Sequence, residues 1–63
     1  MPEDTKRLIA EAFRQAASEK SVSRITVQDI ASRAGISRHT FYYHFRDLFA
    51  LAEWIFSSEY MSD

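Results

Sequence analysis

The chain has one glycine and one proline among its 63 residues, and this scarcity constrains its fold more than any other feature. Glycine and proline are the residues that most often mark turns and end helices. Along most of the sequence, apolar residues recur three and four positions apart, which is the spacing of amphipathic helices. The sequence therefore predicts an all-α fold in a single small domain over residues 1–63.

The first helix is predicted over about residues 4–18. Asp4 or Thr5 can cap its N-terminus, and Pro2 is expected just outside it. Its apolar positions form one stripe, with the charged positions largely off that stripe. The stripe consists of Leu8, Ile9, Ala12, Phe13 and Ala16. The polar segment 18–24 shows no apolar periodicity, so we expect most of it to be a connection.

The second helix is predicted over about residues 27–34 because suitable end residues bracket it. Thr26 can cap its N-terminus, and Asp29 three residues later gives a version of the capping box. Gly35 follows the last inward-facing position. It fits the left-handed residue that ends many helices, a conformation that is cheap only for glycine.

The third helix, over about residues 38–45, is predicted to begin almost at once, because Ser37 can cap it. Two short helices joined by a turn that contains glycine are the signature of a helix-turn-helix. A fourth helix is predicted over about residues 48–60. The expected architecture is a three-helix, homeodomain-like bundle followed by the start of a fourth, linking helix.

The third predicted helix interleaves two surfaces. At about 100° per residue, Phe41 and Phe45 share one face, which we assign to the core. His39, Thr40 and Tyr43 cluster on the opposite face, and Tyr42 and His44 lie on the two shoulders. Arg38 falls nominally inward, but a side chain in the first turn can extend past the helix end. Tyr42 and Tyr43 can also be interpreted as half-buried core residues whose hydroxyl groups reach solvent.

An outward face of Arg, His, Thr and Tyr suits duplex DNA. Arginine can grip guanine O6 and N7 in the major groove, and hydroxyl groups donate to phosphate oxygens. The net charge is −1, but residues 20–47 hold five Lys or Arg against two Asp, together with both histidines. Acidic flanks surround this basic zone, which is an asymmetry that bears on binding partners.

These positions together resemble the N-terminal DNA-binding region of the TetR/AcrR family of bacterial transcriptional regulators. The motif is carried by Thr26, Ile30-Ala31, Ala34-Gly35-Ile36, Ser37 and the stretch from Thr40-Phe41-Tyr42 to Phe45. A longer match through Trp54-Ile55-Phe56 is similar to the DhaS-like regulators within that family. The resemblance implies a homodimer that binds a palindromic double-stranded DNA operator, usually to repress transcription.

The site residues follow from the same resemblance, position by position. It implies base contacts from Arg38, His39 and Tyr43. It implies phosphate contacts from Thr26, Ser37, Thr40, Tyr42 and His44. Family members commonly carry a phosphate-binding lysine where this chain has Leu48, and Arg46 is expected to substitute for it.

Family members also carry a larger C-terminal helical domain, which binds a small-molecule effector and forms the dimer. None of the 63 residues is expected to supply that domain, so we expect a fragment of a longer regulator with a native start at Met1. The expected location is the bacterial cytoplasm, in association with the nucleoid. No cofactor is expected, and no apolar run approaches the roughly 18 residues of a membrane span.

Two other classes of function compete with DNA binding for this sequence. An enzyme or metal site is disfavoured, because the side chains of His39 and His44 point about 140° apart on a helix and the chain has no cysteine. A helical protein-interaction module that does not bind DNA is the alternative that stays open. The apolar residues of the segment 48–61 span nearly the whole helix circumference, more than a three-helix core can cover.

Overall fold

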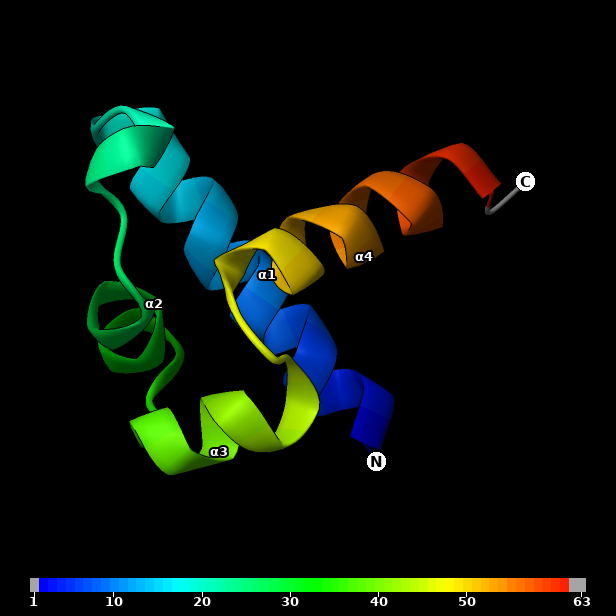
Figure 1. The fold of residues 1–63 in the computed structure, drawn as a ribbon, viewed down its shortest axis with the longest axis horizontal. Coiled ribbons are helices and arrows are strands. Elements are labelled where there is room, and N and C mark those ends of the chain that lie inside the picture. Colours follow the sequence, from blue (N-terminus) through cyan, green and yellow to red (C-terminus); the bar gives the residue numbers. More distant parts are fainter. Residues whose placement is uncertain (1, 62–63) are drawn as a thin grey trace.

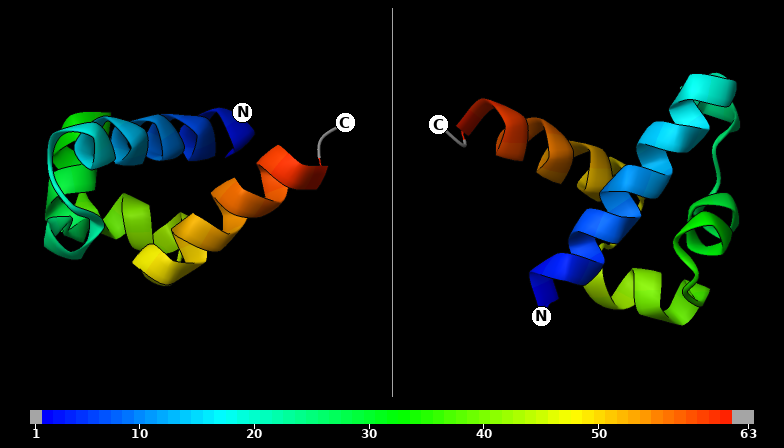
Figure 2. Two further views of the ribbon diagram at one scale, coloured as in Figure 1. Left: turned by 90° about the horizontal axis from the view of Figure 1, so that it is seen from above. Right: turned by 180° about the vertical axis from the view of Figure 1, so that it is seen from behind.

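The structure is a computed structural model that describes the backbone of residues 2–61 and the side chains of residues 4–57. The helices are α1 (Pro2–Glu19), α2 (Val27–Ala34), α3 (Arg38–His44) and α4 (Leu48–Met61), with a short 3-10 turn, η1 (Val22–Arg24), between α1 and α2. The described backbone contains no strand, and the predicted all-α class is confirmed. Figures 1 and 2 show α1, α2 and α3 around a common centre, with the second half of α4 projecting beyond them.

Helix α1 begins at Pro2, about half a turn before the predicted start. Proline is well suited to the first turn of a helix, because the N–H that it lacks would have no partner there. Ile9, Ala12 and Ala16 are buried as predicted. The inward assignment of Leu8 is wrong, since its side chain is 54% exposed. Leu8 lies about 100° around the helix from Ile9, which turns it away from the core.

The two ends of α2 have the geometry predicted for Thr26 and Gly35. The backbone N–H of Asp29 donates to Thr26 Oγ1 (3.1 Å), which caps α2. Gly35 adopts φ 75° and ψ 30°, and its N–H donates to the carbonyl of Ser32 (3.2 Å). The N–H of Ile36 donates to the carbonyl of Ala31 (3.0 Å), which completes a Schellman motif. This turn fixes the direction in which α3 leaves α2.

The core draws on every helix and on the connection after η1. Its buried cluster consists of Ile9, Ala12, Ala16, Ile25, Ile30, Phe41, Phe45 and Leu51. Helix α3 ends at His44 rather than at residue 45, because Phe45 adopts an extended backbone that leads toward α4. Lys6 of α1 lies 5.5 Å from the ring centroid of Phe45 and 5.9 Å from that of Trp54. This cation therefore joins α1, the end of α3 and α4.

Helix α4 carries more apolar surface than the described core covers. Asp47 caps it, since the N–H of Ala50 donates to Asp47 Oδ1 (2.9 Å). Leu51 is fully buried, whereas Phe49 is 82% exposed and Phe56 is 64% exposed. This agrees with the prediction that the helix is apolar around most of its circumference. The side chains of residues 58–61, and Met1 as the expected native start, lie outside the described residues.

Candidate nucleic-acid interface

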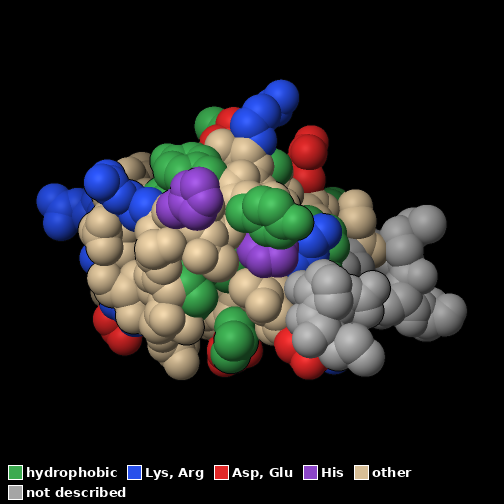
Figure 3. Space-filling view, turned by 90° about the horizontal axis from the view of Figure 1, so that it is seen from below, with side chains coloured by type: hydrophobic (Ala, Val, Ile, Leu, Met, Phe, Trp, Pro, Cys, Tyr) green, Lys and Arg blue, Asp and Glu red, His purple; other side chains and the backbone are tan. Residues whose placement is uncertain are grey.

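Helix α3 lies along one edge of the molecule and turns one face to solvent. Figure 3 looks onto that edge, and both histidines of the chain are visible there beside hydrophobic and cationic side chains. The exposed residues of α3 are Arg38, His39, Tyr42 and Tyr43, with Thr40 and His44 half-buried. Phe41 is fully buried, as is almost all of Phe45, so the predicted inward face is confirmed. The core therefore anchors α3 from one side and leaves the other side free.

The two tyrosines of α3 differ in how firmly the fold holds them. Tyr43 is 81% exposed and packs edge-to-face with the His44 ring, with centroids 5.1 Å apart. Its interpretation as a core residue is wrong. Tyr42 is 54% exposed, and its ring packs edge-on against Phe41 at a centroid distance of 5.4 Å. This packing fixes the ring of Tyr42 while more than half of the side chain stays accessible.

The hydroxyl groups at the two helix starts keep hydrogen-bonding capacity after capping. Ser37 Oγ accepts from the N–H of Thr40 (3.1 Å) and lies 3.1 Å from Thr40 Oγ1. A hydroxyl group has one donor and two acceptor sites. Only one of the two O–H groups is used in the Ser37–Thr40 bond, so the other can donate to a ligand. Thr26 uses an acceptor site in its cap, which likewise leaves its O–H available.

Arg38 and Arg46 are the exposed cations at the two ends of α3. Arg38 is exposed at the first position of the helix, although its helical angle pointed inward. Arg46 follows the helix with its side chain 88% exposed, and its Nε lies 3.5 Å from Asp47 Oδ2. Such an exposed ion pair is weak and leaves the guanidinium free to rearrange. Leu48, at the family's lysine position, is half-buried and packs against the core.

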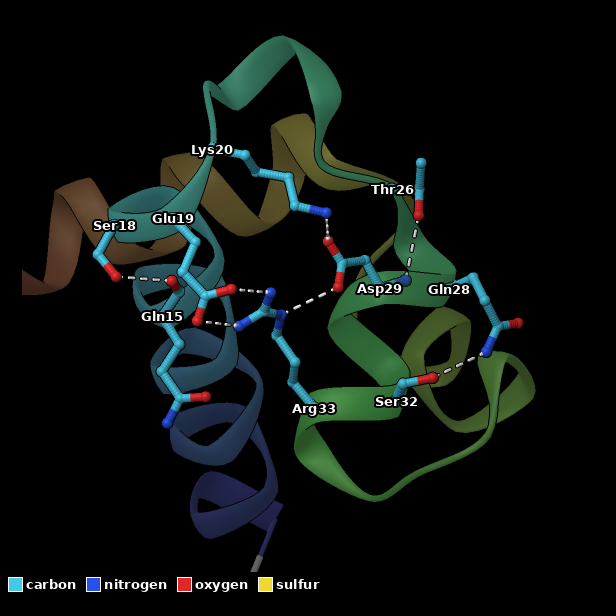
Figure 4. Close-up of polar contacts among 9 residues, drawn as sticks. All are labelled: Gln15, Ser18, Glu19, Lys20, Thr26, Gln28, Asp29, Ser32 and Arg33. Carbon is cyan, nitrogen blue, oxygen red and sulfur yellow. Dashed lines mark hydrogen bonds and ion pairs between the residues drawn. The ribbon is translucent and has the colours of Figure 1, made fainter.

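The basic zone of the sequence is smaller in the structure, because two of its cations are paired. Lys20 Nζ lies 2.8 Å from Asp29 Oδ2 and Arg33 Nε lies 2.9 Å from Asp29 Oδ1. Arg33 also makes a two-point ion pair with Glu19 (2.7 and 3.1 Å). Figure 4 shows these four side chains converging between the end of α1 and helix α2. We name them the α1–α2 charge cluster.

Ion pairing within the charge cluster shifts the pKa values of three of its members. Hydrogen bonds, from Lys20 first and Arg33 second, lower the pKa of Asp29. The hydrogen bond from Arg33 lowers the pKa of Glu19, and the two carboxylates in turn raise the pKa of Arg33. The spacing of Asp29 and Arg33, four residues apart on one helix, could have revealed that pair from sequence. The other two pairs join separate segments and gave no such signal.

Other kinds of site find little support in the part of the chain that the structure describes. No three His, Cys, Asp or Glu side chains come together there in a group that could hold a metal ion. None of the helices described is long and apolar enough to cross a membrane.

A capped helix, a glycine turn and a second helix with an exposed polar face define a helix-turn-helix DNA-binding domain. Residues 7–53 match the family model described as bacterial regulatory proteins, tetR family. The chain belongs to the TetR family. It is therefore the DNA-binding domain of a transcriptional regulator, and not an enzyme.

Two curated relatives support this assignment. The chain is 36% identical over 56 residues to the HTH-type dhaKLM operon transcriptional activator DhaS of Lactococcus lactis, covering 89% of this chain and 30% of the relative. It is 43% identical over 47 residues to an uncharacterized HTH-type transcriptional regulator of Haemophilus influenzae, covering 73% of this chain and 23% of the relative. The chain thus spans less than a third of either relative. No solved structure gave a significant match.

Proposed function

We propose that the domain binds double-stranded DNA sequence-specifically, with α3 in the major groove. The observation that carries this proposal is the division of α3 into a phenylalanine face held in the core and a polar face held in solvent. A helix of this width fits the major groove, and side chains near its N-terminus reach base edges. Arg38 and His39 stand at that end.

Arg38, His39 and Tyr43 are the proposed base contacts. All three are exposed on α3. The guanidinium of Arg38 can bind guanine O6 and N7 together, and the imidazole of His39 can donate to a base acceptor. Tyr43 is 81% exposed, so its ring is accessible to a base.

The proposed phosphate contacts surround the base contacts on both sides. They are Thr26, Ser37, Thr40, Tyr42, His44 and Arg46. The O–H groups available at Thr26 and at the Ser37–Thr40 pair support this role, as does the anchored ring of Tyr42. Such contacts set the position of a protein on the duplex without reading its sequence.

The proposal extends to a longer regulator, of which this domain would form the N-terminal part. It would bind a palindromic operator as a homodimer, in association with the nucleoid, and a separate C-terminal domain would receive a small-molecule effector. The resemblance to the family implies repression, whereas the Lactococcus lactis relative is named an activator. A reporter gene placed behind the operator measures the direction of regulation.

A duplex titration at two salt concentrations tests DNA binding. Release of counterions from phosphates lowers the affinity of a DNA-binding protein by a logarithmic slope of about −0.9 per phosphate neutralised. We expect binding to a random-sequence duplex at low salt, which weakens steeply as salt rises. Absence of duplex binding at both concentrations would refute the proposal.

A helical protein-interaction module is a second candidate, and one observation favours it. Phe49 and Phe56 are largely exposed on α4, seven residues apart on the same side of the helix. This candidate predicts that Phe49→Ser and Phe56→Ser abolish association with a protein and leave duplex affinity, measured as above, unchanged.

A further inference from the structure

Asp29 carries a negative charge in the helix turn that Thr26 caps, and Thr26 is proposed to contact a DNA phosphate. It lies in the first turn of α2, and its backbone N–H donates to Thr26 Oγ1 (3.1 Å), the hydroxyl assigned to phosphate contact. Like charges placed together at an interface weaken binding. An unneutralised carboxylate here would therefore oppose the proposed function.

Two cations hold that carboxylate, one on each oxygen. Lys20 Nζ donates to Oδ2 (2.8 Å) and Arg33 Nε donates to Oδ1 (2.9 Å). The Asp29 and Arg33 side chains are each 19% exposed, so solvent screens this pair less than it would a fully exposed one. The lowered pKa of Asp29 keeps it ionised at neutral pH. Its neutralisation must come from these partners rather than from a proton.

The charge balance around Asp29 depends on Lys20. Arg33 is shared, because its terminal nitrogens also bind both oxygens of Glu19 (2.7 and 3.1 Å). The charge cluster therefore contains two acids and two bases, and is neutral as a whole (Figure 4). Removal of the Lys20 charge leaves the cluster with a net negative charge beside the N-terminal turn of α2.

We propose that Lys20 acts on DNA binding through Asp29, by neutralising a carboxylate that would otherwise repel the phosphate near Thr26. This inference rests on the proposed function. Lys20 is assigned no phosphate contact of its own in this scheme, and its ammonium group donates to Asp29 Oδ2 (2.8 Å). It belongs to the segment between α1 and η1, outside the helix-turn-helix.

A double-mutant cycle measures this coupling. Four proteins are titrated with a random-sequence duplex at low salt: the unmodified protein, Lys20→Gln, Asp29→Asn and the double variant. A random sequence suffices because phosphate contacts do not depend on base sequence. Lys20→Gln is expected to weaken binding on the order of tenfold, as one uncompensated like charge would. Asp29→Asn should bind no more weakly than the unmodified protein. The double variant should return to within about threefold of it, because the repelling charge is gone.

Lys20→Arg is the matched control and should bind like the unmodified protein, because it keeps the charge. Urea midpoints of all forms ensure that affinities are compared between folded proteins. Unchanged affinity in Lys20→Gln would overturn the inference by reducing the cluster to a structural role. A double variant as weak as Lys20→Gln would overturn it in favour of a direct phosphate contact. Failure of the unmodified protein to bind any duplex at low salt would instead refute the proposed function, and this inference with it.

Discussion

The division of α3 into two faces is best tested by two aromatic residues that lie two positions apart. Phe41 is fully buried in the core cluster, and Tyr43 is 81% exposed. Truncation of a buried phenylalanine to alanine costs about 3–5 kcal/mol, through lost transfer free energy and the cavity that remains. Truncation of an exposed side chain away from special features usually changes stability by less than about 0.5 kcal/mol.

The size of the domain makes this difference decisive. Typical stabilities of about 0.05–0.15 kcal/mol per residue give roughly 3–9 kcal/mol for a chain of this length. Phe41→Ala therefore removes between a third and all of the free energy of unfolding. With a urea m-value of about 1 kcal/mol/M for a small domain, a loss of 3 kcal/mol moves the midpoint by about 3 M. Tyr43→Ala should move it by about 0.5 M or less.

Urea titration followed by far-ultraviolet circular dichroism measures both midpoints. Phe41→Leu keeps much of the apolar volume and should lose only about 1–2 kcal/mol, so that a transition can be measured even where Phe41→Ala is unfolded in buffer. A Phe41→Ala protein with an unchanged midpoint would contradict the assignment of the inner face. So would a Tyr43→Ala protein as unstable as Phe41→Ala.

Three further predictions concern the turn, the charge cluster and the DNA-facing residues. Gly35→Ala should lower the free energy of unfolding by about 1–2 kcal/mol in urea titration, because a left-handed backbone is strained for any L side chain. The loss is expected even though nothing lies within 4 Å of the added Cβ. An unchanged stability would mean that the backbone at residue 35 relaxes to a negative φ. The pKa values of Asp29 and Glu19 are lowered by folding, so their stabilising effect is present above the ordinary carboxyl pKa of about 4 and is lost as pH falls below it. The urea midpoint should accordingly fall between pH 6 and pH 3, less so in Asp29→Asn, and equal falls in both proteins would argue against the cluster. In duplex titrations Arg38→Ala should relax sequence preference and lose about 1–3 kcal/mol of binding free energy, whereas Tyr42→Phe should weaken binding to all sequences alike. If Arg38→Ala keeps its sequence preference, Arg38 is not a base contact.

Much of the fold could be predicted from sequence because its signals are local. Helix periodicity placed Phe41 and Phe45 inward, since side chains four residues apart lie on the same side of a helix. Thr26 and Ser37 marked two helix starts, and Gly35 marked the turn between them. Each of these residues acts on backbone groups within a few positions, so its neighbours in sequence contain the whole interaction.

The tertiary structure decided which separate segments meet. Glu19 and Arg33 are 14 residues apart, and Lys20 and Asp29 are 9 apart, so only the packing of α1 against α2 brings them together. The exposure of Leu8 was decided in the same way, because periodicity places Leu8 at the edge of the apolar stripe but does not say how far around α1 the core extends. Sequence alone thus determined the helices and the face that α3 offers to a groove. The packing angles between helices determined which charges remain on that surface, since an ion pair needs two groups within about 4 Å.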